Sequence, residues 1–171
     1  GLGDVYKRQI MTTEMKDRVT KLLADYHDRE RKIALLEYEL ANPARVTEAE
    51  MIGAMTYARP EESGRPAGHI SNKTLYIALN YQDRAEEINV DSFKEIHAEL
   101  TKLKEEQDRL NYYISLLEPR PMRVLKRTYI ERASNEDVAK ELGISVRRLQ
   151  EVKNQAIESL AEMYEYTESL H

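Results

Sequence analysis

Residues 138–152 read VAKELGISVRRLQEV, a pattern typical of two helices that cross at a steep angle over a short turn. Such a crossing needs a small residue where the helices meet, and Ala139 supplies it. The turn needs a left-handed residue followed by an apolar one, and Gly143 and Ile144 stand there. Ser145 is suited to cap the second helix. The stretch therefore predicts a helix-turn-helix; an ordinary helical hairpin with a glycine cap is the alternative.

The flanking residues complete this module. Ser134 can cap the first helix of the pair, and the second is expected to continue to about Tyr166. A preceding helix is expected over residues 121–132, after Pro119 has ended the helix before it. The apolar residues expected to face the shared core are Val138, Leu142, Leu149, Val152, Ala156, Ile157 and Leu160. We therefore place a helix-turn-helix domain at residues 118–171.

Two long helices, each with one narrow apolar seam, are expected before this module. The first should run from Thr12 or Thr13 to Ala41, where Asn42-Pro43 ends it. Its seam comprises Val19, Leu22, Tyr26, Ile33, Leu36 and Leu40, with Arg29 in one slot. The second should run from Asp91 or Ser92 to Leu117. Its seam comprises Phe93, Ile96, Leu100, Leu103, Leu110, Ile114 and Leu117, with Gln107 in the one polar slot.

These seams have coiled-coil spacing, and neither helix is stable alone in water. The economical solution is a long antiparallel hairpin, with a parallel homodimer as the competitor. Residues 43–90 between them are expected to form a helical insert. A short helix should begin at Thr47, a loop should occupy residues 58–70, and a further helix should begin after Ser71.

Asp4 to Gln9 resembles the translation of a transposon-end sequencing adaptor, so we expect residues 1–10 to be non-native and Met11 to be the start. The N-terminal domain is then 11–117. With only 6 glycines and 5 prolines in 171 residues, an all-β chain is excluded. We expect an all-α protein.

Composition and motifs argue against several functional classes. The chain has no cysteine, which excludes disulfides, thiolate metal sites and a cysteine nucleophile. No apolar run approaches the roughly 18–20 residues that span a bilayer. Phosphate-binding glycine loops and the HExxH, GxSxG and GxGxxG signatures are absent. We therefore expect a cytoplasmic protein that is not an enzyme and uses no cofactor or metal.

Charge adds to the case for binding double-stranded DNA. Residues 118–154 hold nine basic and six acidic residues, a net of +3, whereas the chain as a whole carries −5 and the remainder therefore −8. The candidates for base contact are Val146, Arg147, Arg148, Gln150, Glu151 and Asn154. The candidates for phosphate contact are Arg120, Arg123, Lys126, Arg127, Ser145 and Lys153.

Residues 117–160 resemble region 4 of the sigma-70 family. The likeness lies in LEPRPMRVLKRTYIERASNEDVAKELGISVRRLQEVKNQAIESL, including its proline-arginine start and its apolar-basic first helix. The resemblance implies promoter DNA and bacterial RNA polymerase as partners. Val146 and Glu151 stand where promoter-reading polar residues are expected, and the aromatic-rich region 2 is missing. A −35 specificity is therefore not carried over.

The whole chain, with LEYEL at residues 36–40 and GHISNKT at 68–74, resembles phage and prophage sigma-like proteins. These lie near the RinA/ArpU type of late-gene activator in Gram-positive bacteria. The resemblance implies DNA binding beside a promoter in the bacterial cytoplasm, at the nucleoid. A phage DNA-packaging protein of the small terminase kind is one alternative. A protein that docks on polymerase without binding DNA is another.

Overall fold

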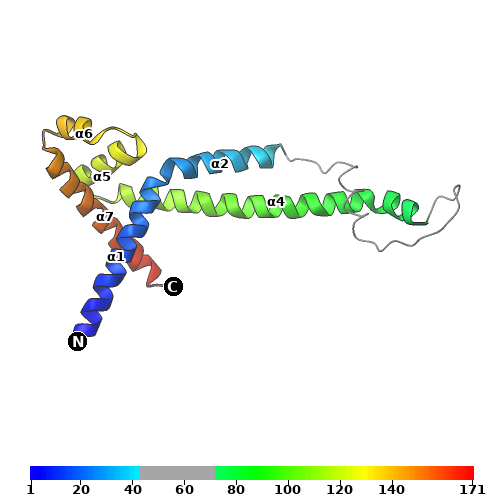
Figure 1. The fold of residues 1–171 in the computed structure, drawn as a ribbon, viewed down its shortest axis with the longest axis horizontal. Coiled ribbons are helices and arrows are strands. Elements are labelled where there is room, and N and C mark those ends of the chain that lie inside the picture. Colours follow the sequence, from blue (N-terminus) through cyan, green and yellow to red (C-terminus); the bar gives the residue numbers. More distant parts are fainter. Residues whose placement is uncertain (43–71) are drawn as a thin grey trace, which may run out of the picture. The chain divides into compact units, whose positions relative to one another are not determined.

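The computed structural model describes the backbone of residues 1–42 and 72–171, and the side chains of residues 1–10, 12–42 and 90–171. Helices account for the secondary structure of this part of the chain, so the all-α prediction is confirmed (Figure 1). The elements are α1 (Leu2–Ala24), α2 (Tyr26–Ala41), α4 (Asn72–Ser115), α5 (Pro119–Leu125), the π-helical turn η1 (Lys126–Ile130), α6 (Asn135–Leu142) and α7 (Val146–Glu168). Across the described residues, no helix has the length and apolar character needed to cross a bilayer.

The predicted first helix has the correct end but the wrong start. It ends at Ala41, yet α1 already begins at Leu2. Thr12 and Thr13 lie inside α1, where their hydroxyls donate to backbone carbonyls one turn earlier at 2.8 and 2.9 Å instead of capping a helix. The helix is also interrupted at Asp25, where α1 gives way to α2.

The predicted second helix starts much earlier than expected. Asp91 and Ser92 lie inside α4, which runs without a break from Asn72 to Ser115. The physical reason is that no glycine or proline stands between Gly68 and Pro119 to interrupt it. The helix expected at Thr47, the loop expected at 58–70 and the expected Ser71 cap lie outside the described residues.

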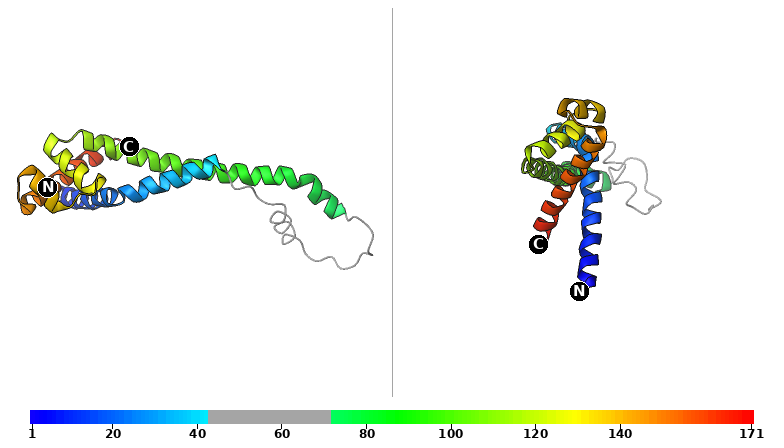
Figure 2. Two further views of the ribbon diagram at one scale, coloured as in Figure 1. Left: turned by 90° about the horizontal axis from the view of Figure 1, so that it is seen from above. Right: turned by 90° about the vertical axis from the view of Figure 1, so that its left-hand side faces the viewer.

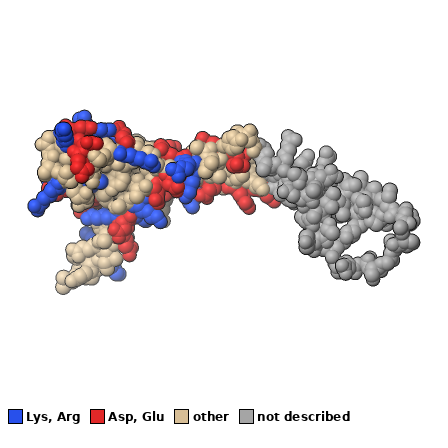
Figure 3. Space-filling model, turned by 45° about the horizontal axis from the view of Figure 1, so that its top comes forward, with Lys and Arg blue, Asp and Glu red and all other residues tan. Residues whose placement is uncertain are grey.

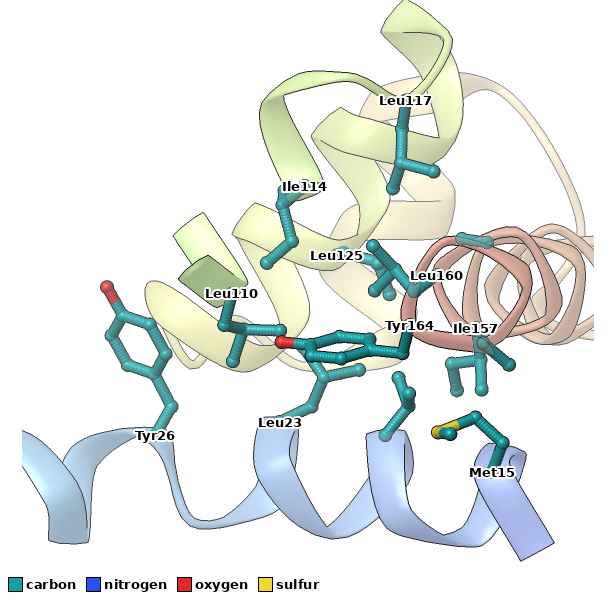
Figure 4. Close-up of a cluster of buried hydrophobic side chains, with 13 residues drawn as sticks. Met15, Leu23, Tyr26, Leu110, Ile114, Leu117, Leu125, Ile157, Leu160 and Tyr164 are labelled. Atoms are coloured by element: carbon teal, nitrogen blue, oxygen red, sulfur yellow. The ribbon is translucent and has the colours of Figure 1, made fainter. Parts of the chain in front are cut away.

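The chain divides into two compact units, residues 1–33 with 102–171 and residues 34–101. The first unit contains the helix-turn-helix candidate and a large apolar core. In that core Leu160 and Tyr164 of α7 lie between α1 and the segment formed by the end of α4 and α5 (Figure 4). The other members are Met15, Val19, Leu23, Tyr26, Leu110, Ile114, Leu117, Leu125, Ala156, Ile157 and Ala161. A domain boundary between residues 117 and 118 would pass through this core.

Ion pairs accompany the packing of α1 on α7. Arg18 donates to both carboxylate oxygens of Glu168, at 3.1 and 2.6 Å, and Lys16 lies 3.2 Å from Glu158. The start of α1 and the end of α7 project on the same side of the first unit (Figure 2).

The polar residues that interrupt the two apolar seams are hydrogen-bonded to each other in the first unit. Arg29 and Gln107 are 5% and 6% exposed, and the Arg29 Nε donates to the Gln107 Oε1 at 2.8 Å. One helical turn earlier on α2, the Tyr26 hydroxyl bonds the Asn111 Oδ1 at 2.9 Å. The two segments therefore run antiparallel here. In the second unit Leu100 is buried, whereas Phe93, also predicted in the seam, is 48% exposed.

Candidate nucleic-acid interface

The turn between α6 and α7 is built from backbone and cap hydrogen bonds. Ser134 accepts the amide of Asp137 at 3.2 Å and so caps α6. Gly143 ends that helix in the left-handed region at φ 65°, and the Ile144 amide donates back to the Ala139 carbonyl at 3.0 Å. The Ser145 hydroxyl accepts the Arg148 amide at 3.0 Å and caps α7. The predictions for these caps and for the left-handed glycine are confirmed.

A small apolar cluster packs α6 against α7. Val138 and Ala139 of α6 pack with Leu149 and Val152 of α7, and Val124 of α5 closes the cluster. All five side chains are at most 3% exposed. Leu142 and Ile144 pack against the cluster while half-buried. The predicted inward face of these helices is therefore confirmed.

The helix α7 is shared between this cluster and the large core of the first unit. Its first half contributes Leu149 and Val152 to the small cluster, and its second half contributes Leu160 and Tyr164 to the large one. Because the helix is continuous, the orientation of its exposed first turns is fixed by packing at both ends. Exposed side chains near its start are thus presented on a rigid support.

The candidates for base contact lie on the exposed face of these first turns. All six are exposed, and the Arg147 side chain is 92% accessible. The Glu151 carboxylate lies 2.9 Å from Arg148 Nη1 and 3.9 Å from Arg147 Nε. The Gln150 amide donates to the Asn154 Oδ1 at 3.1 Å. The structure therefore exposes all six residues on the first turns of α7, with Glu151 linked to both arginines and Gln150 linked to Asn154.

Four of the six candidates for phosphate contact are exposed to solvent, and the other two are bonded within the protein. Arg120, Arg123 and Lys126 are exposed. Ser145 is exposed as well, and its cap bond uses an oxygen lone pair, so its proton can still be donated. On the face seen in Figure 3, lysines and arginines are interspersed with acidic side chains and form no continuous basic field. On that face, DNA contact would depend on a few individually placed cations.

Arg127 is held by acidic neighbours inside the module. Its guanidinium bonds Glu131 one turn along the chain and both carboxylate oxygens of Glu141 on α6. These hydrogen bonds, first that to Glu141 and then that to Glu131, raise the pKa of Arg127, and the Arg127 bond lowers the pKa of Glu141. The geometry assigns Arg127 to joining η1 to α6. The i to i+4 spacing could have indicated Glu131, but only the fold brings Glu141 near.

Lys153 is likewise turned toward the protein. Its ammonium donates to the Asn135 Oδ1 at 3.3 Å and lies 4.9 Å from the centre of the Tyr129 ring. Burial lowers the pKa of Lys153 and raises that of Tyr129. Lys153 thus ties α7 to η1 and to the start of α6, a role that its sequence position did not indicate.

A histidine not singled out from sequence joins the N-terminal helices to the module. The His27 Nε2 lies 2.7 Å from the carbonyl oxygen of Ile130, the last residue of η1, and its Nδ1 lies 3.2 Å from Glu30. Two residues after Ile130, Arg132 has a φ of 55°. His27 therefore supports the irregular backbone that leads into α6.

Within the described residues, no group of three or more histidine, aspartate or glutamate side chains is placed to hold a metal ion. Comparisons of the chain with protein-family models, with curated proteins and with solved structures find no match.

Proposed function

We propose that this protein is a sequence-specific DNA-binding regulator of transcription. In this proposal α6 and α7 form a helix-turn-helix whose second helix enters the major groove. The observation that carries the proposal is the α6–α7 turn. It is capped by Ser134 and Ser145, closed by Gly143, and packed so that the first turns of α7 present polar side chains outward.

The exposed residues have chemistry suited to base edges. Arginine binds guanine O6 and N7 bidentately, and glutamine or asparagine binds adenine N6 and N7. Arg147, Arg148, Gln150 and Asn154 supply these groups within three helical turns. Arg120, Arg123 and Lys126 would contact phosphates, because they are exposed cations near the start of the same module.

The resemblance to sigma-70 region 4 supports a partner as well as a ligand. It favours RNA polymerase beside a promoter, in the manner of phage and prophage late-gene activators. The finer fold assignment belongs to the same proposal, with a helical hairpin carrying a sigma region 4-like module in a bacterial cytoplasm.

The test is selection of binding sites from a random duplex library with the full chain. The selected duplex is then titrated against salt beside a scrambled duplex. An Arg147→Ala/Arg148→Ala variant is the probe, and Lys94→Ala/Lys102→Ala is its control, because it removes two exposed cations from α4. We expect a recovered consensus, steep salt dependence, and a loss confined to the probe variant.

Single variants separate base from phosphate contacts. Arg147→Ala at a base contact should cost about 1–3 kcal/mol of binding free energy and relax preference at one position. A uniform loss on all sequences would make Arg147 a phosphate contact. If no sequence is enriched while the chain still captures polymerase, a docking protein without DNA binding is favoured. If the consensus is bound by a ring of eight or more subunits in light scattering, the packaging alternative is favoured.

A further inference from the structure

A carboxylate stands between the two arginines that are the strongest candidates for base contact. Glu151 lies on the exposed face of α7, with one oxygen 2.9 Å from Arg148 Nη1 and the other 3.9 Å from Arg147 Nε. Arg148 and Glu151 each keep half of their side-chain surface accessible. The pair therefore presents hydrogen-bond donors and an acceptor side by side to whatever approaches this face.

A negative charge at this place opposes binding to a uniform phosphate surface. Phosphate contacts supply most of the affinity for non-specific DNA, and Glu151 both repels phosphates and occupies the nearby guanidinium of Arg148. The repulsion is offset only where the DNA offers a hydrogen-bond donor. In the major groove, such donors are the amino groups of cytosine N4 and adenine N6.

The arrangement matches one base pair better than the others. A guanine edge offers two acceptors, O6 and N7, and the cytosine paired with it offers a donor, N4, beside them. Arg148 can donate to the guanine while Glu151 accepts from the cytosine, and the remaining guanidinium N–H groups still face Glu151. An A·T or T·A pair also offers acceptors and a donor, but the donor, adenine N6, lies between the acceptors adenine N7 and thymine O4. It therefore lacks the two adjacent acceptors that one guanidinium can bind together.

We propose that Arg148 and Glu151 read a single G·C base pair as a unit, and that Glu151 reduces binding to DNA that lacks this pair. This inference rests on the proposed DNA-binding function and assigns its specificity. Glu151 disfavours DNA that lacks the G·C pair. Its removal should therefore strengthen binding to such DNA and weaken the preference for DNA that contains the pair.

The experiment uses the full chain as wild type, Glu151→Ala, Arg148→Ala and the double variant. Glu162→Ala is the matched control, because it removes an exposed carboxylate from the same helix beyond the candidate contacts. Each protein is titrated with the selected duplex, with duplexes in which each G·C pair is replaced by A·T, and with a scrambled duplex. Circular dichroism checks that every variant keeps its helices.

For the wild type, we expect one G·C pair whose replacement weakens binding about 5- to 150-fold. In Glu151→Ala that penalty should shrink and affinity for the scrambled duplex should rise, while Glu162→Ala behaves as wild type. Arg148→Ala should lose the penalty at the same pair, and the double variant should lose no more. The inference is overturned if the two single variants affect different pairs, or if Glu151→Ala keeps full discrimination. A wild type that prefers no duplex overturns the proposed function itself.

Discussion

Replacing Gln107 with leucine tests whether a buried polar pair holds the end of α4 against α2. Arg29 is 5% exposed, its Nε donates to Gln107 at 2.8 Å, and its Nη2 donates to the Leu22 carbonyl at 2.7 Å. Leucine at 107 would keep the volume of the seam but leave the Arg29 Nε–H buried without an acceptor. The lost bond involves a charged group, so we expect unfolding free energy to fall by about 1.5–3 kcal/mol.

The double variant Arg29→Met/Gln107→Leu should regain the unfolding free energy that Gln107→Leu loses. It removes the buried charge together with its partner and fills the seam with apolar atoms, a change that is often neutral or stabilising. We therefore expect the double variant to be more stable than Gln107→Leu alone. A positive coupling of this kind cannot arise from two independent surface changes.

Urea unfolding followed by far-ultraviolet circular dichroism measures these differences. Gln155→Leu is the control, because it makes the same replacement at an exposed position on α7 and should change stability by less than about 0.5 kcal/mol. If Gln107→Leu costs no more than this control, the buried pair contributes nothing. If the double variant is no more stable than Gln107→Leu alone, the buried charge of Arg29 is not what makes the loss of Gln107 costly.

Three further predictions follow from single groups. Tyr164→Phe should raise the unfolding free energy by about 1 kcal/mol in urea titrations, because the Tyr164 hydroxyl is buried with no hydrogen-bond partner among the described residues. Tyr26→Phe should lower the unfolding free energy by a similar amount, because it loses the 2.9 Å hydrogen bond to Asn111. Gly143→Ala should lower the melting temperature and reduce the unfolding free energy by about 1–2 kcal/mol, because alanine is strained at φ 65°. The added Cβ meets no atom within 4 Å, so backbone strain is the whole of the expected effect. Arg127 lowers the pKa of Glu141 from its ordinary 4.5, so the pair's stabilisation should be complete above that value and disappear as pH falls through the lowered pKa; acid unfolding of Glu141→Gln should lack this component.

The local features of the module could be predicted from sequence because they depend on neighbours along the chain. A serine three residues before the amide it accepts, and a glycine that alone tolerates a left-handed turn, are short-range rules, and Ser134, Ser145 and Gly143 obey them. The start of α1 could not be predicted in this way. A threonine hydroxyl can cap a helix or bond a carbonyl inside one, and Thr12 and Thr13 do the second.

The long-range contacts could not be predicted, since they depend on how the helices are placed. The polar slots at Arg29 and Gln107 were each visible as interruptions of an apolar seam, but pairing them requires the register of two helices far apart in sequence. The same limit applies to Glu141 with Arg127 and to Asn135 with Lys153. The DNA contacts of the candidate interface remain a prediction.

The shared helix α7 makes the N-terminal segments part of the candidate interface's support. In the second half of α7, Leu160 and Tyr164 are buried against residues of α1 and α4. In its first turn, Leu149 is buried against α6. Separating residues 118–171 from the rest would expose the apolar second half of α7 to water, at a cost proportional to that area. Since the first turns of α7 carry the base-contact candidates, any movement of α1 on α7 changes the support of those side chains. The proposed DNA recognition would therefore depend on the packing of the whole first unit, so its test uses the full chain.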